Sequence, residues 1–332
     1  MAIPRAISVR ARPLPPGLLL VLTVLLLIGA APAQAGVTTI DTGDRAAVEA
    51  AYRDVYLPAA AVRAPAPPDG AVDRCEAGST PAAIQGATRD LVNYFRAMSA
   101  VAPVRFDARH DAKAQQAALI GYADSTLSHA PTPLSPCWSP AGAEAAASSN
   151  LGLGHAGTDV VRAYMDDAGP GNVAAGHRWW LQRPSTRTMG NGTVGTANAL
   201  WVAGDTAAPA GPRFTSWPTS GYFPGPLEPR GRWSLTAWDP DLDLRGATAA
   251  VRGPAGDLVV EQLPVDPTFG SLVFEVGTLP PVRGPVADVY QVTITGLLER
   301  GDPLPPYRYA VALVDPGAGA SPELPLPPGW RP

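Results

Sequence analysis

Residues 176–184 read GHRWWLQRP, and with the continuation STRTMGNG at 185–192 they form the most distinctive stretch of the chain. The stretch contains His177, one of only 4 histidines in 332 residues. Imidazole binds metals and transfers protons near neutral pH, so we take His177 as the first candidate site residue. We interpret the neighbouring Trp179 and Trp180 as core residues rather than as a ligand box, because large aromatic rings bury most of their surface.

Four further segments lie upstream of this stretch. They are NYFRAMSAVAPVRFDARHDAKAQQAA (93–118), LSHAPTP (127–133), SNLGLG (149–154) and AYMDD (163–167). Together with 176–184, these segments resemble the CAP superfamily of cysteine-rich secretory, antigen 5 and pathogenesis-related proteins, also called the SCP domain. Their shared order and spacing extend over residues 80–202, in a form similar to a bacterial branch of the family.

The resemblance implies an α-β-α sandwich with a cleft, in which many members bring two histidines and two carboxylates together. Such a set can hold a divalent metal ion such as zinc, with water completing the coordination. Carried over to this chain, the two family histidines correspond to His129 and His177, which are therefore the predicted metal ligands. The alternative role for His129 is a loop cap that hydrogen-bonds to the backbone.

The acidic residues implied by the resemblance are displaced in this chain. Ser149 stands where the Glu-Asn motif of the family places its glutamate. Glu144, five residues earlier, is a candidate catalytic residue if the loop is remodelled, and the alternative is an ordinary exposed side chain. Asp166 or Asp167 falls near the second acidic position, and Asp166 is the second candidate general base.

The other histidines receive structural interpretations. His110 lies inside a predicted helix, where we expect a satisfied structural histidine, and His155 lies in a glycine-rich loop, where we expect a solvated one. The tripeptide Asn191-Gly192-Thr193 matches a glycosylation sequon. Asn-Gly is first of all a tight-turn signal, however, so we predict a turn at residues 189–192.

Apolar spacing and helix-breaking residues predict the helices of the first 200 residues. The predicted helices span 44–57, ended by Pro58; from about 79–81 to before Pro103; 108–123; and 158–167. A short apolar strand is predicted at 199–202.

The character of the sequence changes near residue 203, where proline and glycine begin to punctuate short runs of β-branched and aromatic residues. Such runs predict strands at 232–238, 247–252, 258–263, 271–276, 289–295 and 307–314. This pattern predicts a small all-β sandwich of the immunoglobulin-like kind. The expected fold class is therefore α+β, with a CAP-like α-β-α sandwich followed by a β-sandwich.

The domain boundaries follow from these changes in composition. We expect a signal peptide at 1–35, an N-terminal helix with a proline-rich linker at 36–70, and a CAP/SCP-like domain at 71–204. A β-sandwich domain at 205–315 and a disordered proline-rich tail at 316–332 complete the prediction.

The N-terminus predicts export. Three arginines within the first 12 residues precede the apolar run LLLVLTVLLLIGAA (18–31), and small residues at Ala33 and Ala35 mark a cleavage site. A retained membrane anchor is the alternative, but the run is shorter than the roughly 18 to 20 residues that a spanning helix needs. We therefore expect a secreted, extracellular protein with no integral membrane span in the mature chain.

The two cysteines, Cys75 and Cys137, are predicted to form a disulfide, because an exported protein matures in an oxidising compartment. Two separate buried thiols are the alternative. The formal net charge of −4 and the lack of a basic run argue against nucleic acid as a partner.

Three functional hypotheses follow. The first is an extracellular binding or interaction module at the cell envelope, whose partner is a small apolar ligand or a cell-surface molecule. The second is a metal-assisted hydrolase, in which His129 and His177 hold the ion while Glu144 or Asp166 serves as general base toward bound water. The third is a structural envelope component. Whether the protein is an enzyme stays open, and we favour the first hypothesis because fold alone does not fix function.

Overall fold

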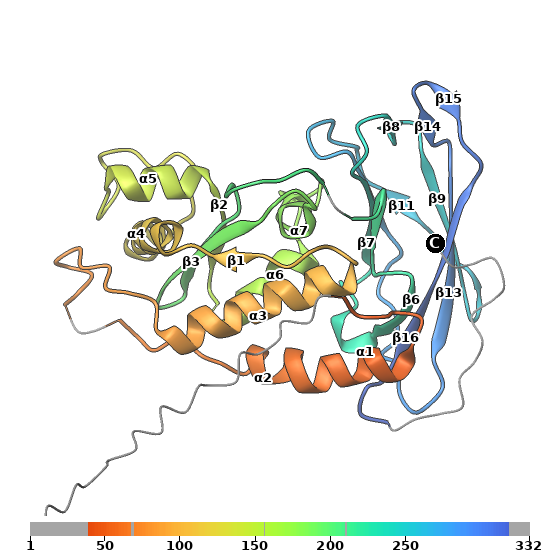
Figure 1. Cartoon of the computed structure of the whole chain (residues 1–332), viewed down its shortest axis with the longest axis horizontal. Coiled ribbons are helices and arrows are strands. Elements are labelled where there is room, and N and C mark those ends of the chain that lie inside the picture. The colour runs from red at the N-terminus through yellow and green to blue at the C-terminus, as the bar shows by residue number, and fades with distance from the viewer. Residues whose placement is uncertain (1–38, 68–69, 156, 210, 319–332) are drawn as a thin grey trace, which may run out of the picture. The chain divides into compact units, whose positions relative to one another are not determined.

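A computed structural model describes residues 39–67, 70–155, 157–209 and 211–318 (Figure 1). These residues all belong to one compact unit, residues 36–332. The predicted signal peptide and residues 319–332 of the predicted tail lie outside the described residues. Among the helices within the described ranges, none combines the length and the hydropathy needed to span a bilayer.

The first large element of the described chain is a three-layer arrangement around a four-stranded sheet of order β1-β3-β4-β2. The strands are β1 (Arg105–Phe106), β2 (Ser149–Leu153), β3 (Thr188–Val194) and β4 (Ala197–Trp201). One face packs against α4 (Ala108–Asp124) and α5 (Pro140–Ala147) through an alanine-rich core. The other face packs against α3 (Ala82–Met98), α6 (Asp159–Asp166) and α7 (Gly176–Gln182). The predicted α-β-α sandwich is confirmed.

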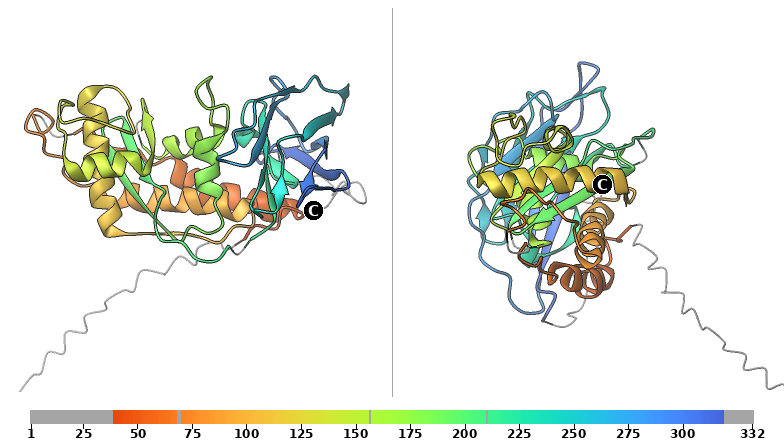
Figure 2. Two further views of the ribbon diagram at one scale, coloured as in Figure 1. Left: turned by 90° about the horizontal axis from the view of Figure 1, so that it is seen from above. Right: turned by 90° about the vertical axis from the view of Figure 1, so that its left-hand side faces the viewer.

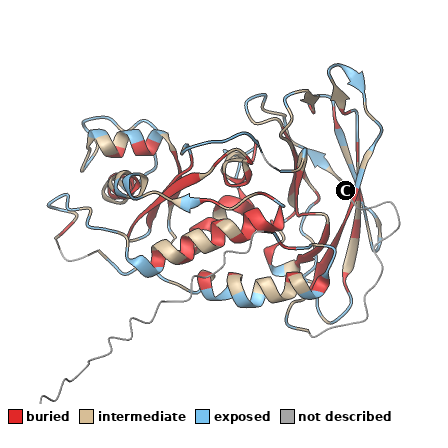
Figure 3. Cartoon of the chain, in the orientation of Figure 1, coloured by how far each residue is buried: buried red, intermediate tan, exposed pale blue. Residues whose placement is uncertain are grey.

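Helices α3 and α4 form for reasons that are visible in the sequence. One side of α3 carries buried residues that include Ile84, Leu91 and Phe95 (Figure 3). Helix α4 begins at Asp107, whose carboxylate accepts hydrogen bonds from the backbone N–H groups of Arg109 and His110. Capping of this kind satisfies N–H groups that have no partner inside the helix.

The N-terminal helix is longer than predicted. It consists of α1 (Arg45–Ala51), a π-helical turn η1 (Tyr52–Tyr56) and α2 (Leu57–Ala60), so Pro58 does not end it. Proline has no N–H to donate to the preceding turn. Pro58 directly follows the π-helical turn, where the N–H of Leu57 bonds to the carbonyl of Tyr52, five residues back, so the regular α-helical bonding is already interrupted there. The helix runs beside α3, as the views in Figure 2 show, and the ring of Tyr56 lies 5.2 Å from that of Tyr94.

The predicted turn at residues 189–192 is wrong, because these residues lie inside the buried strand β3. The two glycines serve close packing instead of chain reversal. A Cβ atom on Gly192 would lie 2.1 Å from the backbone N of Gln115 in α4. Asn191 of the sequon is fully buried, and its amide donates a hydrogen bond to Gln85. Glycine at both positions therefore allows α4 to approach the sheet.

The described part of the chain after residue 204 contains two larger sheets, of order β10-β9-β13-β16-β6 and β11-β12-β7-β5. Their strands are β5 (Phe214–Trp217), β6 (Gly221–Pro224), β7 (Arg232–Ala237), β9 (Thr248–Gly253), β10 (Gly256–Asp257), β11 (Glu261–Gln262), β12 (Ser271–Glu275), β13 (Asp288–Thr295) and β16 (Tyr307–Val314). A third sheet joins β8 (Leu242–Asp243), β14 (Leu298–Glu299) and β15 (Asp302–Pro303), and a 3-10 turn, η2 (Gly225–Leu227), follows β6.

Rings from the two larger sheets contact each other, as in a sandwich: Trp233 of β7 lies 5.7 Å from Tyr290 of β13. The predicted strands at 232–238, 247–252, 271–276, 289–295 and 307–314 are present. The prediction of one strand at 258–263 is wrong. The chain there leaves β10 in one sheet and enters β11 in the other, so neither stretch is long. The α+β class is confirmed.

The three-layer part and the β-rich part share one hydrophobic core cluster. The ring of Phe95 in α3 meets Trp217 of β5 edge-on at 5.5 Å, and Trp217 in turn contacts Phe223 of β6. Separately, the disulfide between Cys75 and Cys137 is confirmed, and it ties the segment before α3 to the loop before α5.

Candidate functional site

Two adjoining hollows lie along strand β2, and together they form the groove that we consider as the candidate site. One has a volume of about 470 Å³ and the other about 510 Å³. His129, His177 and Asn172 line both hollows. The structure therefore brings the two predicted histidines, 48 positions apart in the chain, to one groove.

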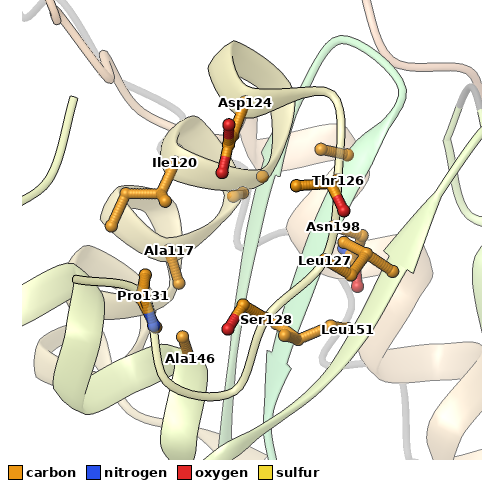
Figure 4. A pocket seen from close by; sticks show the side chains of 13 residues that line it. Ala117, Ile120, Asp124, Thr126, Leu127, Ser128, Pro131, Ala146, Leu151 and Asn198 are labelled. Atoms are coloured by element: carbon orange, nitrogen blue, oxygen red, sulfur yellow. The ribbon is translucent and has the colours of Figure 1, made fainter. Parts of the chain in front are cut away.

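A third pocket lies next to the groove, between α4 and the loop that leads to His129 (Figure 4). Its lining includes Ala117, Leu127 and Pro131, and its volume is about 10 Å³. A cavity of that size holds no more than about one water molecule. It is therefore too small to be a ligand site.

His177 is held in place by a buried carboxylate. Its Nδ1 lies 2.7 Å from Oδ1 of Asp167, while Oδ2 of Asp167 accepts a hydrogen bond from the backbone N–H of Arg178. Asp167 is 1% exposed and takes a left-handed conformation at the end of α6, which turns its side chain toward α7. The ring of His177 also stacks on Tyr164 at 5.4 Å.

His129 is held through the same ring atom. Its Nδ1 lies 2.8 Å from the carbonyl oxygen of Ala146, near the end of α5. An imidazole that donates from Nδ1 carries the lone pair on Nε2, which is then available to a ligand. In the part of the chain that the structure describes, no protein group hydrogen-bonds to Nε2 of His129 or His177. Both rings are therefore oriented with one nitrogen free for the groove.

Of the two predicted carboxylates, Glu144 and Asp166, only Asp166 lines the groove. Glu144 is exposed and pairs with Lys113 at 2.6 Å, and it does not line either hollow. Asp166 lines the larger hollow but forms an ion pair with Arg162. Burial raises the pKa of Asp166, and the nearby Arg162 guanidinium opposes this effect. The carboxylate that contacts His177 is thus Asp167, the neighbour of Asp166.

The donor set does not fit a catalytic zinc site. Such sites use three protein ligands and leave one position to water. Among the described residues, no group of three or more histidine, cysteine, aspartate or glutamate side chains is placed to hold a metal ion. Asp167 is engaged with His177 and Arg178. Among the described residues, His129 and His177 therefore have no third ligand placed beside them. The metal and catalytic assignments stay predictions.

Ser149 occupies the position at which the resemblance places a glutamate. It lies at the start of β2, lines the smaller hollow and is 5% exposed. Its hydroxyl has no hydrogen-bond partner among the described residues. The hydroxyl can therefore hydrogen-bond to a ligand or a water molecule in the groove.

The other two histidines lie at different places. His110 stacks on Trp201 at 4.7 Å, and within the described ranges its buried Nδ1 has no hydrogen-bond partner. It is structural as predicted, but the expectation of a satisfied histidine is wrong. His155 lines the larger hollow, with its side chain one-third exposed and Nδ1 3.9 Å from Asp159.

Sequence reasoning missed the groove residues that come from the β-rich part. Asp266 and Phe269, between β11 and β12, line the smaller hollow, and Arg230, before β7, lines the larger one. The ring of Phe269 also contacts Trp179 of α7. These residues lie 53 or more positions after His177, and no local pattern marks them.

A comparison with protein families gives one match. The model described as "CAP: Cysteine-rich secretory protein family" matches residues 89–203, which contain both groove histidines, strands β1 to β4 and helices α4 to α7. No curated protein matches the chain.

Proposed function

We propose that this chain, which carries a CAP domain at residues 89–203, is an extracellular binding module at the cell envelope that holds its ligand in the groove between His129 and His177. The observation that carries the proposal is the orientation of the two imidazole rings. Each is fixed through Nδ1 by a protein oxygen, and each leaves Nε2 to an open groove. Rings fixed in this way lose little conformational entropy when a ligand binds.

The lining of the groove supports a ligand with both polar and apolar parts. Trp180, Val173 and Phe269 give apolar surface to the smaller hollow, while the histidines, Asn172 and Ser149 give polar atoms. Binding sites commonly combine a mainly apolar wall with a few fixed polar groups. A metal-assisted hydrolase is the weaker candidate, because a third protein ligand is missing from the described residues.

Two observations support a location outside the cytoplasm. The chain has a disulfide, and disulfides persist mainly in oxidising compartments. Its first 35 residues also have the charge, apolar run and small residues of a signal peptide. CAP proteins are, in addition, generally secreted.

The test is retention of envelope material by the purified full chain. Wild type, a His129→Ala/His177→Ala double variant and an Arg252→Ala control, altered at an exposed site on β9, are immobilised and exposed to one soluble envelope extract. Mass spectrometry then quantifies what each protein retains. We expect a ligand held by wild type and control, and reduced about tenfold or more on the double variant, as for lost hydrogen bonds to fixed groups. Equal retention by all three proteins would refute a histidine-dependent binding site, and it would leave the structural-component hypothesis in place.

A further inference from the structure

Strand β2 forms one wall of the groove. It is the last strand of its sheet, and within the described residues only β4 pairs with it. Ser149 and Asn150 line the smaller hollow, and Leu151 to Leu153 line the larger one. The groove therefore follows all five residues of β2, which span about 17 Å at the usual rise of a strand.

The register with β4 shows which backbone groups of β2 face the groove. The backbone N–H of Val202 donates to the carbonyl of Ser148, and that of Gly154 donates to the carbonyl of Thr196. Between these two bonds the antiparallel register is continuous. Because hydrogen-bonded pairs alternate in such a ladder, residues 150 and 152 also bond toward β4. The N–H and C=O groups of residues 149, 151 and 153 consequently point away from β4, to the free edge.

The free edge carries unused hydrogen-bonding capacity. Across the described ranges, no other element hydrogen-bonds to the main chain of Ser149, Leu151 or Leu153. The buried hydroxyl of Ser149 likewise has no hydrogen-bond partner among the described residues. Exposed strand edges pair readily with other strands, and proteins usually cover or charge them. Here the edge lines a groove, although Ser149 to Gly152 are buried and only Leu153 is half-buried.

We propose that the groove binds an extended polypeptide segment, which pairs with β2 as an additional strand. This inference rests on the proposed binding function and names its partner. The outward N–H and C=O groups recur at every second residue of β2, and only another extended peptide presents acceptors and donors at the same spacing. A lipid or a sugar would leave this regular series of backbone groups unpaired.

The walls of the groove then give the peptide its sequence preference. Side chains of a bound strand point alternately to its two faces. His129 and the loop before it lie on the α4–α5 side of β2, whereas His177 and Tyr164 lie on the α6–α7 side. Near Ser149, Trp180 and Phe269 offer an apolar surface. We expect an apolar side chain of the peptide at that end, and polar side chains that reach Nε2 of the histidines farther along.

The test begins with a pool of eight-residue peptides randomised at every position, selected on the immobilised full chain. The best peptide is then remade with a single N-methyl group at each position in turn. Pairing with β2 predicts an alternating result, with a loss of about tenfold or more in affinity at every second residue and about twofold or less between them. A lack of alternation, or a pool from which no peptide is enriched, would overturn the proposal.

A variant pair tests the strand itself. Leu153→Pro removes one outward N–H without touching the ladder to β4, and proline is tolerated on edge strands in that position. Leu153→Ala keeps the N–H and shortens the side chain. We expect Leu153→Pro to weaken the selected peptide about tenfold and Leu153→Ala about threefold or less. Equal effects overturn the proposal, and the N-methyl scan on wild type decides the matter if Leu153→Pro does not fold.

Two other occupants would give different outcomes. If β2 pairs with β2 of a second copy, sedimentation shows a dimer that dissociates on Leu153→Pro, and the proposal is overturned. If the envelope ligand retained by His129 and His177 yields no amino acids on acid hydrolysis, the peptide inference is overturned while the binding function stands. Failure of the binding function would appear separately, as equal retention by the double variant.

Discussion

The guanidinium of Arg178 donates a hydrogen bond to the hydroxyl of Ser234 at 2.9 Å, and so connects α7 of the CAP domain to β7 of the β-rich part. The same buried side chain donates to the carbonyls of Met165, Asp166 and Arg232. Arg178 directly follows His177 in the chain. The position of a groove histidine is thus tied to a strand outside the CAP domain.

Loss of Arg178 should be costly. Arg178→Met leaves the Ser234 hydroxyl and three carbonyls without their donor, so we expect a loss of about 3 kcal/mol or more in the free energy of unfolding. Urea unfolding measures it. The control is Arg252→Met at an exposed site, for which we expect about 0.5 kcal/mol or less. Similar losses for the two variants would contradict the role given to Arg178.

Asp167 should control ligand binding through His177. Asp167→Asn fits the left-handed backbone, but it can accept from only one of the two N–H groups that Asp167 now serves. We expect retention of the groove ligand to fall about tenfold, as for other residues that orient a ligating histidine. The control is Asp90→Asn, because Asp90 does not line the groove. Retention of the groove ligand by Asp167→Asn at the wild-type level would refute this role of Asp167.

The pH dependence of stability should contain a contribution from Glu228. Burial raises the pKa of this carboxyl group above its ordinary value. A raised folded-state pKa adds stability at low pH that is lost as the pH rises through it. Oε1 alone accepts from Trp233 and from the N–H of Gly231, so Glu228→Gln can keep both bonds. We expect the variant to gain stability relative to wild type between about pH 4 and pH 7. Urea unfolding measures the free energy of unfolding of both proteins across this range. A difference between wild type and Glu228→Gln that does not change with pH would contradict the prediction.

The disulfide should contribute strongly to stability. It joins residues 62 positions apart, and the chain-entropy model gives about 4 kcal/mol for a loop of that size. We expect a Cys75→Ser/Cys137→Ser variant to unfold at correspondingly lower urea. Reducing agent should lower the stability of wild type and leave the variant unchanged, and a response of both proteins would point to another cause.

The metal hypothesis has a direct measurement. Elemental analysis of the purified full chain, beside the His129→Ala/His177→Ala variant, reports whether these rings hold an ion. Because no group of three or more metal-ligating side chains is present among the described residues, we expect less than about 0.1 metal ion per chain in both proteins after dialysis against a weak chelator. Metal near one ion per chain in wild type alone would favour the hydrolase hypothesis instead.

The sequence predicted the parts of the fold that depend on local pattern. Helix α4 was predicted from its alanine-rich pattern, and the α-β-α order was implied by the family resemblance of the motifs that hold His129 and His177. The predictions of a helix end at Pro58 and of a turn at residues 189–192 were wrong, because the roles of Pro58 and of the glycines of β3 depend on tertiary context. Pro58 directly follows a π-helical turn inside a longer helix, and Gly192 lies where α4 touches the sheet.

The candidate site was less predictable for a physical reason. The choice between Asp166 and Asp167 depends on a left-handed residue at the end of α6, which only the folded backbone reveals. Phe269 and Arg230 reach the groove from the β-rich part, and their approach depends on how that part packs on α7. Motif spacing carries information about the CAP domain alone.

The edge-on contact between Phe95 and Trp217 has a consequence for how such a chain can evolve. A protein cut after Val202 would present Phe95 and its neighbours to water as an apolar surface, and surfaces of that kind promote aggregation. Recombination that transmits either half alone is therefore disfavoured. The two halves should be inherited together, and substitutions on one side of the shared core should be followed by compensating ones on the other.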